Sequence, residues 1–229
     1  MNTLFDRIRR FFSKPITFLR LRRIVWRFVK RTADIFISLI SLIGLSPIFI
    51  VVAILIKLDD GGPVFFRQTR TGKNGKAFKI LKFRTCRVDN NVLDSGEDQY
   101  TKIGEMLRRT SIDELPQLVN ILKGEMSFIG PRPWITEYYD NMTENQRIRS
   151  TVRPGLTGLA QVKGRNAVSI FDKIGYDLDY VSNYTFGEDM RVFALTFKAL
   201  FGDDETTAVN AGKATIHTEL DQLKAQNHA

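Results

Sequence analysis

Two adjacent carboxylates, Asp113 and Glu114, follow a pair of arginines, Arg108 and Arg109, within a short polar stretch of the chain. Adjacent carboxylates can hold Mg²⁺, and a carboxylate among cations can attack the phosphorus of a phosphoanhydride. The same residues also have a structural interpretation, because Ser111 with Glu114 three residues later is a capping-box pattern at a helix start. Spacing alone favours the capping interpretation, so the case for chemistry depends on the surrounding motifs.

Cations that could bind phosphate lie on both sides of this cluster. Residues 63–85 have the pattern of two short strands around a glycine-containing turn, and the second strand alternates apolar residues with basic ones that include Lys82 and Arg84. A half-buried hairpin with one solvated face explains this pattern as well as a phosphate-binding surface does. Arg132 lies between two prolines, which indicates either a rigid turn or a stiffly held phosphate clamp.

Residues 153–158, RPGLTG, predict another constrained turn, and the polar stretch LAQVKGRN follows over residues 159–166. Polar residues between glycines can approach a ligand closely, because glycine lets two groups come near without a side chain between them. Turns contain the same residue types for purely conformational reasons. Both interpretations remain open from the residues alone.

The element that would position these groups is an apolar run from Ala33 to Ile56, whose only charge is Asp34. As a helix it would reach about 36 Å, enough for a hydrocarbon core of about 30 Å. Basic segments flank the run on both sides, and such segments prefer the cytoplasmic face of a membrane. Ser46 and Pro47 supply a break, because proline cannot donate to the Ile43 carbonyl while the serine hydroxyl can satisfy it.

The sequence therefore predicts a re-entrant helix-break-helix whose arms, about 15 to 20 Å long, are each too short to cross the membrane. A proline-kinked spanning helix is the simpler alternative. A buried core helix of a soluble protein is the third, and a continuous apolar run of this length is unusual there.

Several segments around this run have recognisable patterns. Residues 1–31 interleave aromatic and basic residues, which predicts an interfacial helix; a helix packed on its own domain and a nucleic-acid-binding segment are the alternatives. Residues 101–109 and 189–201 have helical spacing, and the second stretch predicts either a core helix or a second interfacial helix. Residues 88–99 predict a polar loop, and residues 203–229 a loose tail with a short helix at 219–225.

Composition limits the remaining choices. The chain has 229 residues, 43% of them apolar, enough for one compact domain beside a membrane element. Its mean hydropathy of -0.15 excludes a polytopic transporter, and its net charge of +9 predicts an anionic partner.

The single cysteine, Cys86, excludes an internal disulfide and a cysteine metal cluster. Both histidines, His217 and His228, lie in the polar tail, which gives little support to a hydrolase triad or a zinc site. No cleavable signal peptide is expected, because the apolar run begins late and exceeds an h-region in length.

Three long motifs in fixed order resemble the bacterial sugar transferases, small monotopic phosphoglycosyl transferases that act on polyprenyl phosphates. The motifs are PVFFRQTRTGKNGKAFKILKFRT, LRRTSIDELPQLVNILKGEMSFIGPRP and VRPGLTGLAQVKGRN, preceded by KRTADI and the broken apolar run. The resemblance covers roughly residues 28–202. It implies transfer of a sugar-1-phosphate from a UDP-sugar to undecaprenyl phosphate with release of UMP, at the start of surface-glycan or exopolysaccharide assembly.

The resemblance also implies roles for individual residues. Asp113 corresponds to the aspartate that attacks the sugar-linked phosphorus to form a phosphosugar-aspartyl intermediate, and Glu114 to a Mg²⁺ ligand. Arg108 and Arg132 correspond to arginines expected near phosphate. The other matched residues are expected as neighbours of the substrate: Lys82, Arg84, Gln161, Arg165 and Asn166.

The sequence departs from the family pattern in two places. Cys86 stands where methionine is common, and Lys163 stands where asparagine is usual. Neither change removes a charge that the chemistry requires, although Lys163 could alter contacts with the nucleotide sugar. The long basic N-terminus is not required by the core motifs.

Together these observations predict an α+β monotopic membrane protein at the cytoplasmic face of the bacterial inner membrane. We expect a basic amphipathic segment at 1–30, a re-entrant helix at 31–58, a small cytoplasmic catalytic domain with interfacial helices at 59–202, and a polar tail at 203–229. The expected partners are a UDP-sugar, undecaprenyl phosphate and anionic membrane lipids, with Mg²⁺ as cofactor; a homodimer is compatible with the sequence.

Two other classes of function remain as alternatives. A non-catalytic basic membrane-associated scaffold explains the first 60 residues but assigns Asp113 and Glu114 to helix capping. Nucleic-acid binding is not expected, because it gives no reason for the apolar run. The sequence contains no motif that distinguishes one UDP-sugar from another.

Overall fold

The computed structural model describes residues 18–87, 100–164, 168–201 and 216–227. In chain order its helices and strands are α2 (Phe18–Gly44), α3 (Ser46–Asp60), β1 (Phe65–Thr71), β2 (Ala77–Phe83), α4 (Lys102–Arg109), α5 (Gln117–Lys123), β3 (Ser127–Ile129), α6 (Thr136–Asp140), α7 (Glu144–Arg147), β4 (Gly155–Thr157), α8 (Leu159–Gly164), α9 (Ile170–Ser182), α10 (Phe186–Phe201) and α11 (Ile216–Asn227). Short 3-10 turns lie at Lys73–Gly75, Ile112–Glu114 and Ile148–Thr151. This mixed arrangement confirms the α+β expectation. The predicted loop at 88–99 and residues 1–17 of the predicted basic segment at 1–30 lie outside the described residues.

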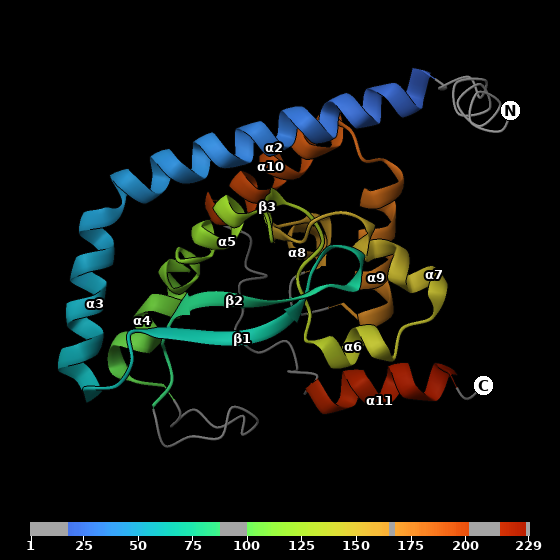
Figure 1. The fold of residues 1–229 in the computed structure, drawn as a ribbon. Helices are drawn as coiled ribbons and strands as arrows, with labels where there is room; N and C mark the ends of the chain where they lie inside the picture. Colours follow the sequence, from blue (N-terminus) through green and yellow to red (C-terminus); the bar gives the residue numbers. More distant parts are fainter. Residues whose placement is uncertain (1–17, 88–99, 165–167, 202–215, 228–229) are drawn as a thin grey trace, which may run out of the picture.

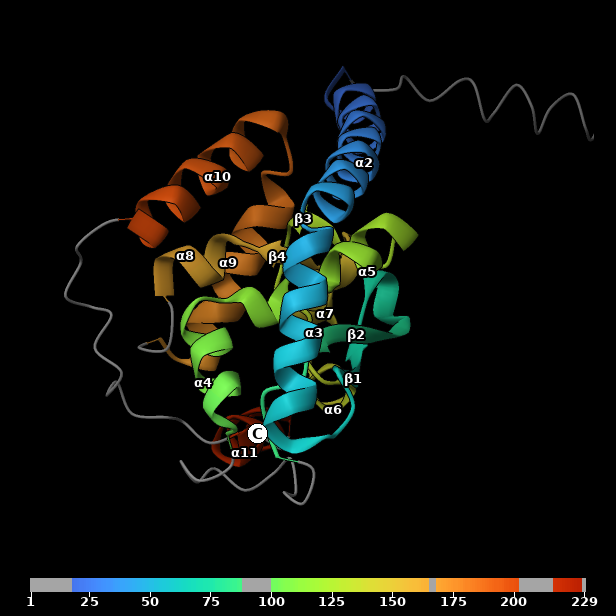
Figure 2. The same ribbon diagram turned by 90° about the vertical axis from the view of Figure 1, so that its left-hand side faces the viewer.

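The break in the apolar run is present where the sequence predicts it. Helix α2 runs along one side of the molecule, and α3 leaves it at Leu45 with a bend of 59° (Figures 1 and 2). Pro47 lies in the first turn of α3, and the Ser46 hydroxyl donates to the Ile43 carbonyl at 2.7 Å. By length and composition, no single helix among the described residues could cross a membrane, whereas the bent pair together could. The predicted helix-break-helix shape is thus confirmed.

Helix α2 is longer than the apolar run, because it begins at Phe18 and includes the end of the basic segment. It therefore crosses the expected boundary between residues 30 and 31 without interruption. Its polar side chains hold it to the rest of the chain. Arg31 donates to the carbonyls of Ile121 and Leu122 at 2.6 and 2.9 Å, and so satisfies the free C-terminal end of α5.

Asp34, the one charge within the apolar run, is also used for this attachment. Its carboxylate is 4% exposed and accepts hydrogen bonds from the Ser127 hydroxyl and the Phe128 amide, both at 3.2 Å. The opposite side of α2 is apolar and exposed, with Phe36, Ile40 and Ile43 each more than half exposed. One helix therefore joins a polar docking side to an exposed apolar side.

The predicted hairpin is confirmed as an antiparallel pair, β1 and β2, in which Gln68 lies opposite Ile80 and Phe66 opposite Lys82. A second pair, β3 and β4, is parallel and joins two motifs that are separate in the sequence. Glycine is required at this junction, because a Cβ on Gly155 would lie 2.1 Å from the Gly130 nitrogen. The glycines of GPRP and RPGLTG thus allow close approach of two backbones.

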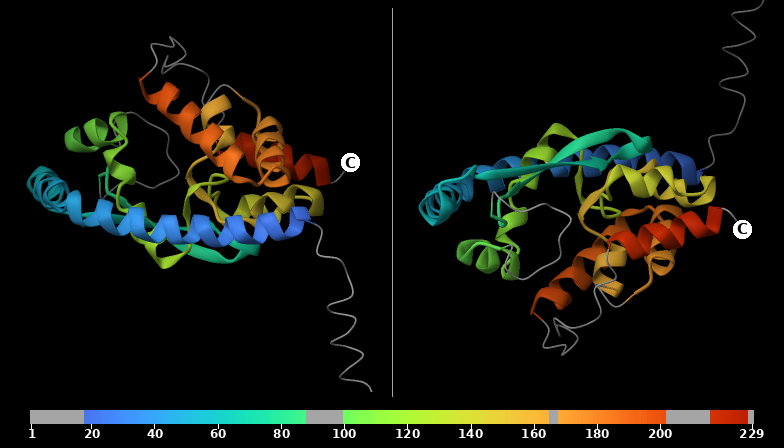
Figure 3. Two further views of the ribbon diagram at one scale, coloured as in Figure 1. Left: turned by 90° about the horizontal axis from the view of Figure 1, so that it is seen from above. Right: turned by 90° about the horizontal axis from the view of Figure 1, so that it is seen from below.

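Helix α10 confirms the predicted amphipathic helix. Val192 is fully buried in a core cluster with Tyr180 from α9 and Ile129 from β3. The other side of α10 exposes an apolar stripe of Phe186, Met190, Phe193 and Phe197. Seen from above, α2 and α10 come together at their N-terminal ends and diverge from there (Figure 3).

The short helix predicted at 219–225 within the C-terminal tail is confirmed, but it is longer than predicted and packed against the domain instead of loose. Residues 216–227 form α11, which packs beside α6 (Figure 1) and buries Leu220 and Leu223 against Tyr138 and Ile174. The Tyr138 hydroxyl and the Lys173 ammonium both bond to Glu219, each at 2.8 Å. Although the tail is mostly polar, Leu220 and Leu223 lie at positions i and i+3 on one side of the helix, which is enough to dock a short helix.

The docking of α11 predicts a stability effect. Leu223→Ala should lower the free energy of unfolding by about 2 kcal/mol, because Leu223 is fully buried and its truncation leaves a cavity. Denaturant unfolding of the detergent-solubilised protein measures this. Gln222→Ala, an exposed neighbour on the same helix, serves as the control. Equal stability of the two variants would show that α11 does not contribute to the core.

Candidate active site

The two carboxylates lie on a 3-10 turn, Ile112–Glu114, between α4 and α5. Helix α4 begins with a capping bond from the Gly104 amide to the Thr101 hydroxyl and ends at Arg109. Ser111 then adopts a left-handed conformation with φ of 57°, uncommon for a residue other than glycine, and turns the chain toward β2. Residue conformations of this kind cluster at functional sites.

The capping-box interpretation of Ser111 and Glu114 is wrong. Ser111 makes no side-chain capping bond, and the helix that follows begins only at Gln117, after Pro116. The Glu114 carboxylate instead accepts a hydrogen bond from Lys82 at 2.6 Å. The sequence could not reveal this outcome, because capping depends on the backbone angles at Ser111.

Two cations from other sequence motifs, Lys82 and Arg132, lie beside the carboxylates. The Lys82 ammonium, at the end of β2, lies 2.6 Å from Glu114 Oε1 and 3.8 Å from Asp113 Oδ2. Arg132 Nη2 lies 3.7 Å from the same Glu114 oxygen, and the Arg132 side chain is 49% exposed. The site therefore combines two carboxylates with two cations, one of which is accessible to a ligand.

The surroundings shift the pKa values of the two carboxylates in opposite directions. Burial raises the pKa of Asp113 above its ordinary value, and the neighbouring charge of Glu114 adds to the rise, while Lys82 and Arg108 oppose it. Burial acts on Glu114 in the same direction, but the charges of Arg132 and Lys82 outweigh it and hold the pKa of Glu114 below its ordinary value. Glu114 is thus the more firmly ionised carboxylate, and Asp113 the more basic one.

Arg108 and Arg84 lie in different surroundings. Arg108 stacks on the Tyr100 ring, with its guanidinium carbon 4.5 Å from the ring centroid, and contributes positive charge to Asp113. Arg84 forms an ion pair with Asp60 at the end of α3 and donates to the carbonyls of Pro63 and Cys86. The structure therefore pairs Arg84 with the end of α3, and its expected place as a neighbour of the substrate stays a prediction.

The remaining predicted site residues are in the segment after β4. Gln161 lies at the start of α8 and donates to the Leu156 carbonyl at 2.9 Å, while its side-chain oxygen is buried without a hydrogen-bond partner among the described residues. Arg165 and Asn166 lie outside the described residues. The exposed Lys163, one of the two departures, has its ammonium 5.2 Å from the Tyr176 ring centroid.

Several residues that support the site were not recognised in the sequence. Asn120 accepts from the Leu81 amide and donates to the Lys79 carbonyl, which ties α5 to β2 and fixes Lys82 relative to the 3-10 turn. Gln117, which is 2% exposed, hydrogen-bonds the Glu114 side chain. Both are ordinary polar residues on a short helix, and only the tertiary structure reveals their partners.

Arg70 on β1 is a further cation near the site. Burial, and then the charge of Arg132, lowers the pKa of Arg70 to about 10, so its guanidinium stays protonated at neutral pH. Its charge also interacts with Glu114. Arg70 belongs to the basic hairpin pattern of the sequence, but that pattern does not separate it from the exposed basic residues around it.

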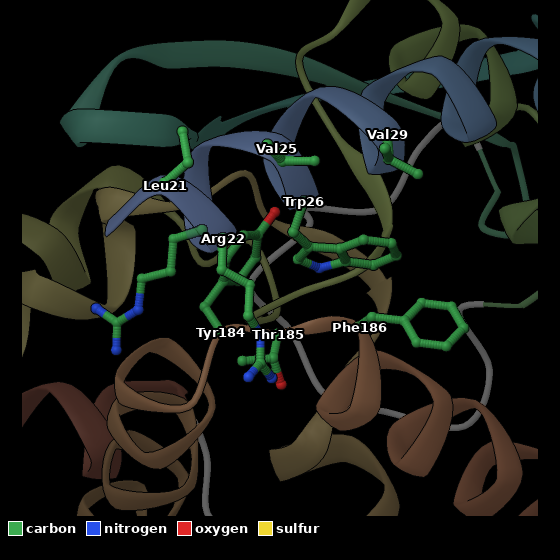
Figure 4. Close-up of a pocket in the computed structure, with 9 residues that line it drawn as sticks. Leu21, Arg22, Val25, Trp26, Val29, Tyr184, Thr185 and Phe186 are labelled. Atoms are coloured by element: carbon green, nitrogen blue, oxygen red, sulfur yellow. The ribbon is translucent and has the colours of Figure 1, made fainter. Parts of the chain in front are cut away.

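A cavity of about 350 Å³ lies elsewhere, between the N-terminal half of α2 and the start of α10 (Figure 4). Trp26 and Phe186 both line it and contact each other edge to face, with ring centroids 5.1 Å apart. None of the carboxylates or cations of the candidate site lines this cavity. The candidate site is therefore a polar surface region, separate from the apolar cavity.

Comparisons with known proteins identify the family of the chain. The family described as "Bacterial sugar transferase" matches residues 25–203. "Uncharacterized sugar transferase EpsL" of Bacillus subtilis is 40% identical over 193 residues, 82% of this chain and 96% of the relative. "Exopolysaccharide production protein ExoY" of Sinorhizobium fredii is 41% identical over 194 residues, 75% of this chain and 84% of the relative.

A third relative has a name that states a reaction. "UDP-glucose:undecaprenyl-phosphate glucose-1-phosphate transferase" of Caulobacter vibrioides is 39% identical over 188 residues, 76% of this chain and 70% of the relative. The family match covers the carboxylates, both site cations and the bent helix pair from residue 25 onward. The chain therefore belongs to the bacterial sugar transferase family and is a transferase enzyme.

Proposed function

We propose that this enzyme transfers a sugar-1-phosphate from a UDP-sugar to undecaprenyl phosphate and releases UMP. The observation that carries the proposal is the cluster of Asp113 and Glu114 with Lys82 and Arg132, contributed by different motifs. Two carboxylates alone would repel a diphosphate, so the adjacent cations are what make the site suitable for one. The scaffold alternative assigns Asp113 and Glu114 to helix capping, and Ser111 makes no side-chain cap.

The reaction proceeds in two displacements at the same phosphorus. The Asp113 carboxylate attacks the sugar-linked phosphorus, an Oδ–P bond forms, and the P–O bond to UMP breaks with the electron pair leaving on UMP. An oxygen of undecaprenyl phosphate then attacks that phosphorus, and Asp113 leaves as a carboxylate. The raised pKa of Asp113 makes it a better nucleophile than an ordinary aspartate, while Lys82 and Arg132 neutralise the phosphate charge.

Glu114 is the proposed ligand of Mg²⁺. Its carboxylate is held in the ionised form that a hard cation prefers. Mg²⁺ commonly takes one or two carboxylates from the protein and completes its shell with water and phosphate oxygens, so the single Glu114 carboxylate can serve as the protein's ligand. When bound, Mg²⁺ would neutralise the diphosphate and stabilise the departing UMP.

The bent pair of α2 and α3 is the proposed membrane anchor. Its exposed apolar residues and the stripe on α10 would lie in one leaflet, and the site would remain on the cytoplasmic face with the basic segments. A soluble nucleotide sugar and a membrane-embedded lipid phosphate can meet only at such an interface. An N-terminal tag that is accessible only from the outer side of intact cells would contradict this topology.

The decisive experiment is UMP release from a panel of UDP-sugars, with detergent-solubilised protein, Mg²⁺ and undecaprenyl phosphate. Release from one sugar, stopped by chelation of Mg²⁺ and restored by its return, would support the reaction and identify the donor. Labelled sugar phosphate should then appear on the lipid. UMP release that continues unchanged in the presence of chelator would contradict the metal assignment, and no lipid product would contradict the acceptor.

The pKa shift of Asp113 predicts the pH dependence of the first step. Attack requires the ionised carboxylate, so the rate of UMP release is full above the folded-state pKa of Asp113 and is lost as the pH falls through it. Because that pKa is raised, the acid limb should lie above the value of about 3.9 for an ordinary aspartate. Lys82→Met should move the limb to still higher pH, because Lys82 acts to lower this pKa.

The measurement is the pH profile of kcat/KM for the UDP-sugar, and Lys79→Met provides the control. Lys79 is an exposed lysine on the same strand, so its loss should leave the limb in place. If the acid limb of the pH profile stays at the same pH in Lys82→Met, a group other than Asp113 controls it.

A further inference from the structure

The segment that carries Arg132 is fastened through its carbonyl oxygens. Pro131 and Pro133 flank Arg132 and have no N–H to donate, so this segment can be held mainly by donors from other elements. Five such donors reach it: Tyr180 Oη to the Ile129 carbonyl at 3.2 Å, the Gly155 amide to Pro131 at 2.9 Å, Arg149 Nη2 to Arg132 at 2.8 Å, Arg70 Nη1 to Pro133 at 3.5 Å and the Thr71 amide to Trp134 at 2.8 Å. The backbone around Arg132 is thereby fixed on both sides.

Arg149 supplies the bond to Arg132 itself. It lies on the 3-10 turn Ile148–Thr151 and is 3% exposed. Its Nε and Nη2 atoms donate to one oxygen of Asp177 at 2.9 and 2.6 Å, and its guanidinium carbon lies 3.9 Å from the Trp134 ring centroid. One planar group therefore contacts a carboxylate, a carbonyl and an aromatic face at once.

Asp177 is the counter-charge of this arrangement and is 1% exposed on α9. A buried ion pair of this kind is not in itself strong evidence for stability, because the desolvation of both charges offsets much of their attraction. Its effect on geometry is more specific. Arg149 connects α9 to the carbonyl of the residue whose side chain reaches Glu114.

We propose that Arg149, held by Asp177, is a positioning residue that sets the Arg132 guanidinium against the donor diphosphate. This inference rests on the proposed function, since it takes Arg132 as a phosphate ligand. Arg149 is buried, and its guanidinium is engaged by Asp177, the Arg132 carbonyl and the Trp134 ring, so it does not touch the reacting atoms. Its action is to fix the backbone from which the half-exposed Arg132 side chain extends.

The substitution that tests the proposal is Arg149→Lys. Lysine keeps the positive charge beside Asp177, but its single ammonium cannot reproduce the planar fork that bonds Asp177 and the Arg132 carbonyl together. Misplacement of a binding group by about 1 Å can cost about 100-fold in rate. We therefore expect kcat/KM for the UDP-sugar to fall by about 10- to 100-fold.

A double-mutant cycle separates positioning from general destabilisation. Arg132→Ala should itself lower kcat/KM, and adding Arg149→Lys to it should then lower kcat/KM by less than about threefold, because the group that Arg149 positions is gone. If Arg149→Lys causes the same 10- to 100-fold loss with and without Arg132, the proposal is overturned. The proposal also fails if Arg149→Lys alone has no effect on kcat/KM.

Arg147 offers a matched control two residues away. It also donates to backbone carbonyls, those of Tyr139 and Asp140, and its guanidinium carbon lies 5.1 Å from the Tyr139 ring centroid, but its partners lie outside the Arg132 loop. Arg147→Lys should leave kcat/KM within about twofold of the wild type. An equal loss in both arginine variants would indicate a structural effect and would count against positioning.

The wild-type reaction distinguishes this proposal from the one on which it rests. If wild-type protein releases no UMP from any UDP-sugar, the proposed function fails and takes the positioning role with it. If wild-type protein is active and the cycle is additive, only the positioning role is wrong. Apparent melting temperatures of all variants in the same detergent verify that each is folded at the assay temperature.

Discussion

Asp113→Asn should abolish UMP release, with a loss of at least about 1,000-fold in kcat. The amide has nearly the same shape as the carboxylate, but its oxygen carries no charge and cannot form a stable bond to phosphorus. The surroundings of Asp113 should tolerate the change, because its closest cation, Lys82, stays bonded to Glu114 at 2.6 Å. Single-turnover release of UMP from a labelled UDP-sugar measures the effect directly.

A second readout of Asp113→Asn is covalent. In the wild type without lipid acceptor, intact-protein mass spectrometry should show the mass of one sugar phosphate added, and peptide mapping should place it at Asp113. The variant should show no addition. Release of UMP at the wild-type rate by the variant would eliminate Asp113 as the nucleophile, and a label on any other residue would assign that role elsewhere.

Lys30→Met should lower the free energy of unfolding by about 3 to 5 kcal/mol. Lys30 lies on α2, and its ammonium is 2.6 Å from Asp189 of α10, with both side chains buried to at least nine-tenths. Asp189 also accepts from Trp26 at 3.0 Å and from Tyr180 at 2.6 Å. Removing the lysine leaves a buried carboxylate with neutral partners only, which is the costly half of a broken ion pair.

Unfolding of the solubilised protein, followed by tryptophan fluorescence, measures this loss. The double variant Lys30→Met with Asp189→Asn provides the control, because it removes both charges and should recover a large part of the stability. A loss below about 1 kcal/mol in the single variant would show that Asp189 reaches water. The same result would mean that α2 is attached to the domain mainly by its other contacts.

The attachment of α2 has a consequence for function. Lys30, Arg31 and Asp34 lie just before or within the start of the apolar run, yet all three bond to the rest of the domain. The proposed membrane element and the proposed active site are therefore parts of one packed unit. A rigid unit would hold the site at a constant height above the membrane, where the lipid phosphate lies.

Features that depend on local chemistry could be predicted from the residues alone. Proline and serine specify the helix break, because a missing donor and a nearby hydroxyl act within one turn, and the structure has both. Alternation over residues 65–83 specifies the hairpin, since side chains on a strand point alternately to its two faces. The motif order also indicated the family, which the comparisons show.

Other features could not be predicted in this way, because they depend on groups that are far apart in the chain and meet only in the folded protein. Arg84 and Lys82 are two residues apart in one basic motif, yet Arg84 pairs with Asp60 and Lys82 with Glu114. Ser111 matches a capping pattern, but its left-handed backbone removes the cap. The residue type determines which groups a side chain can bind. Burial and the folded backbone determine which of those groups lies next to it.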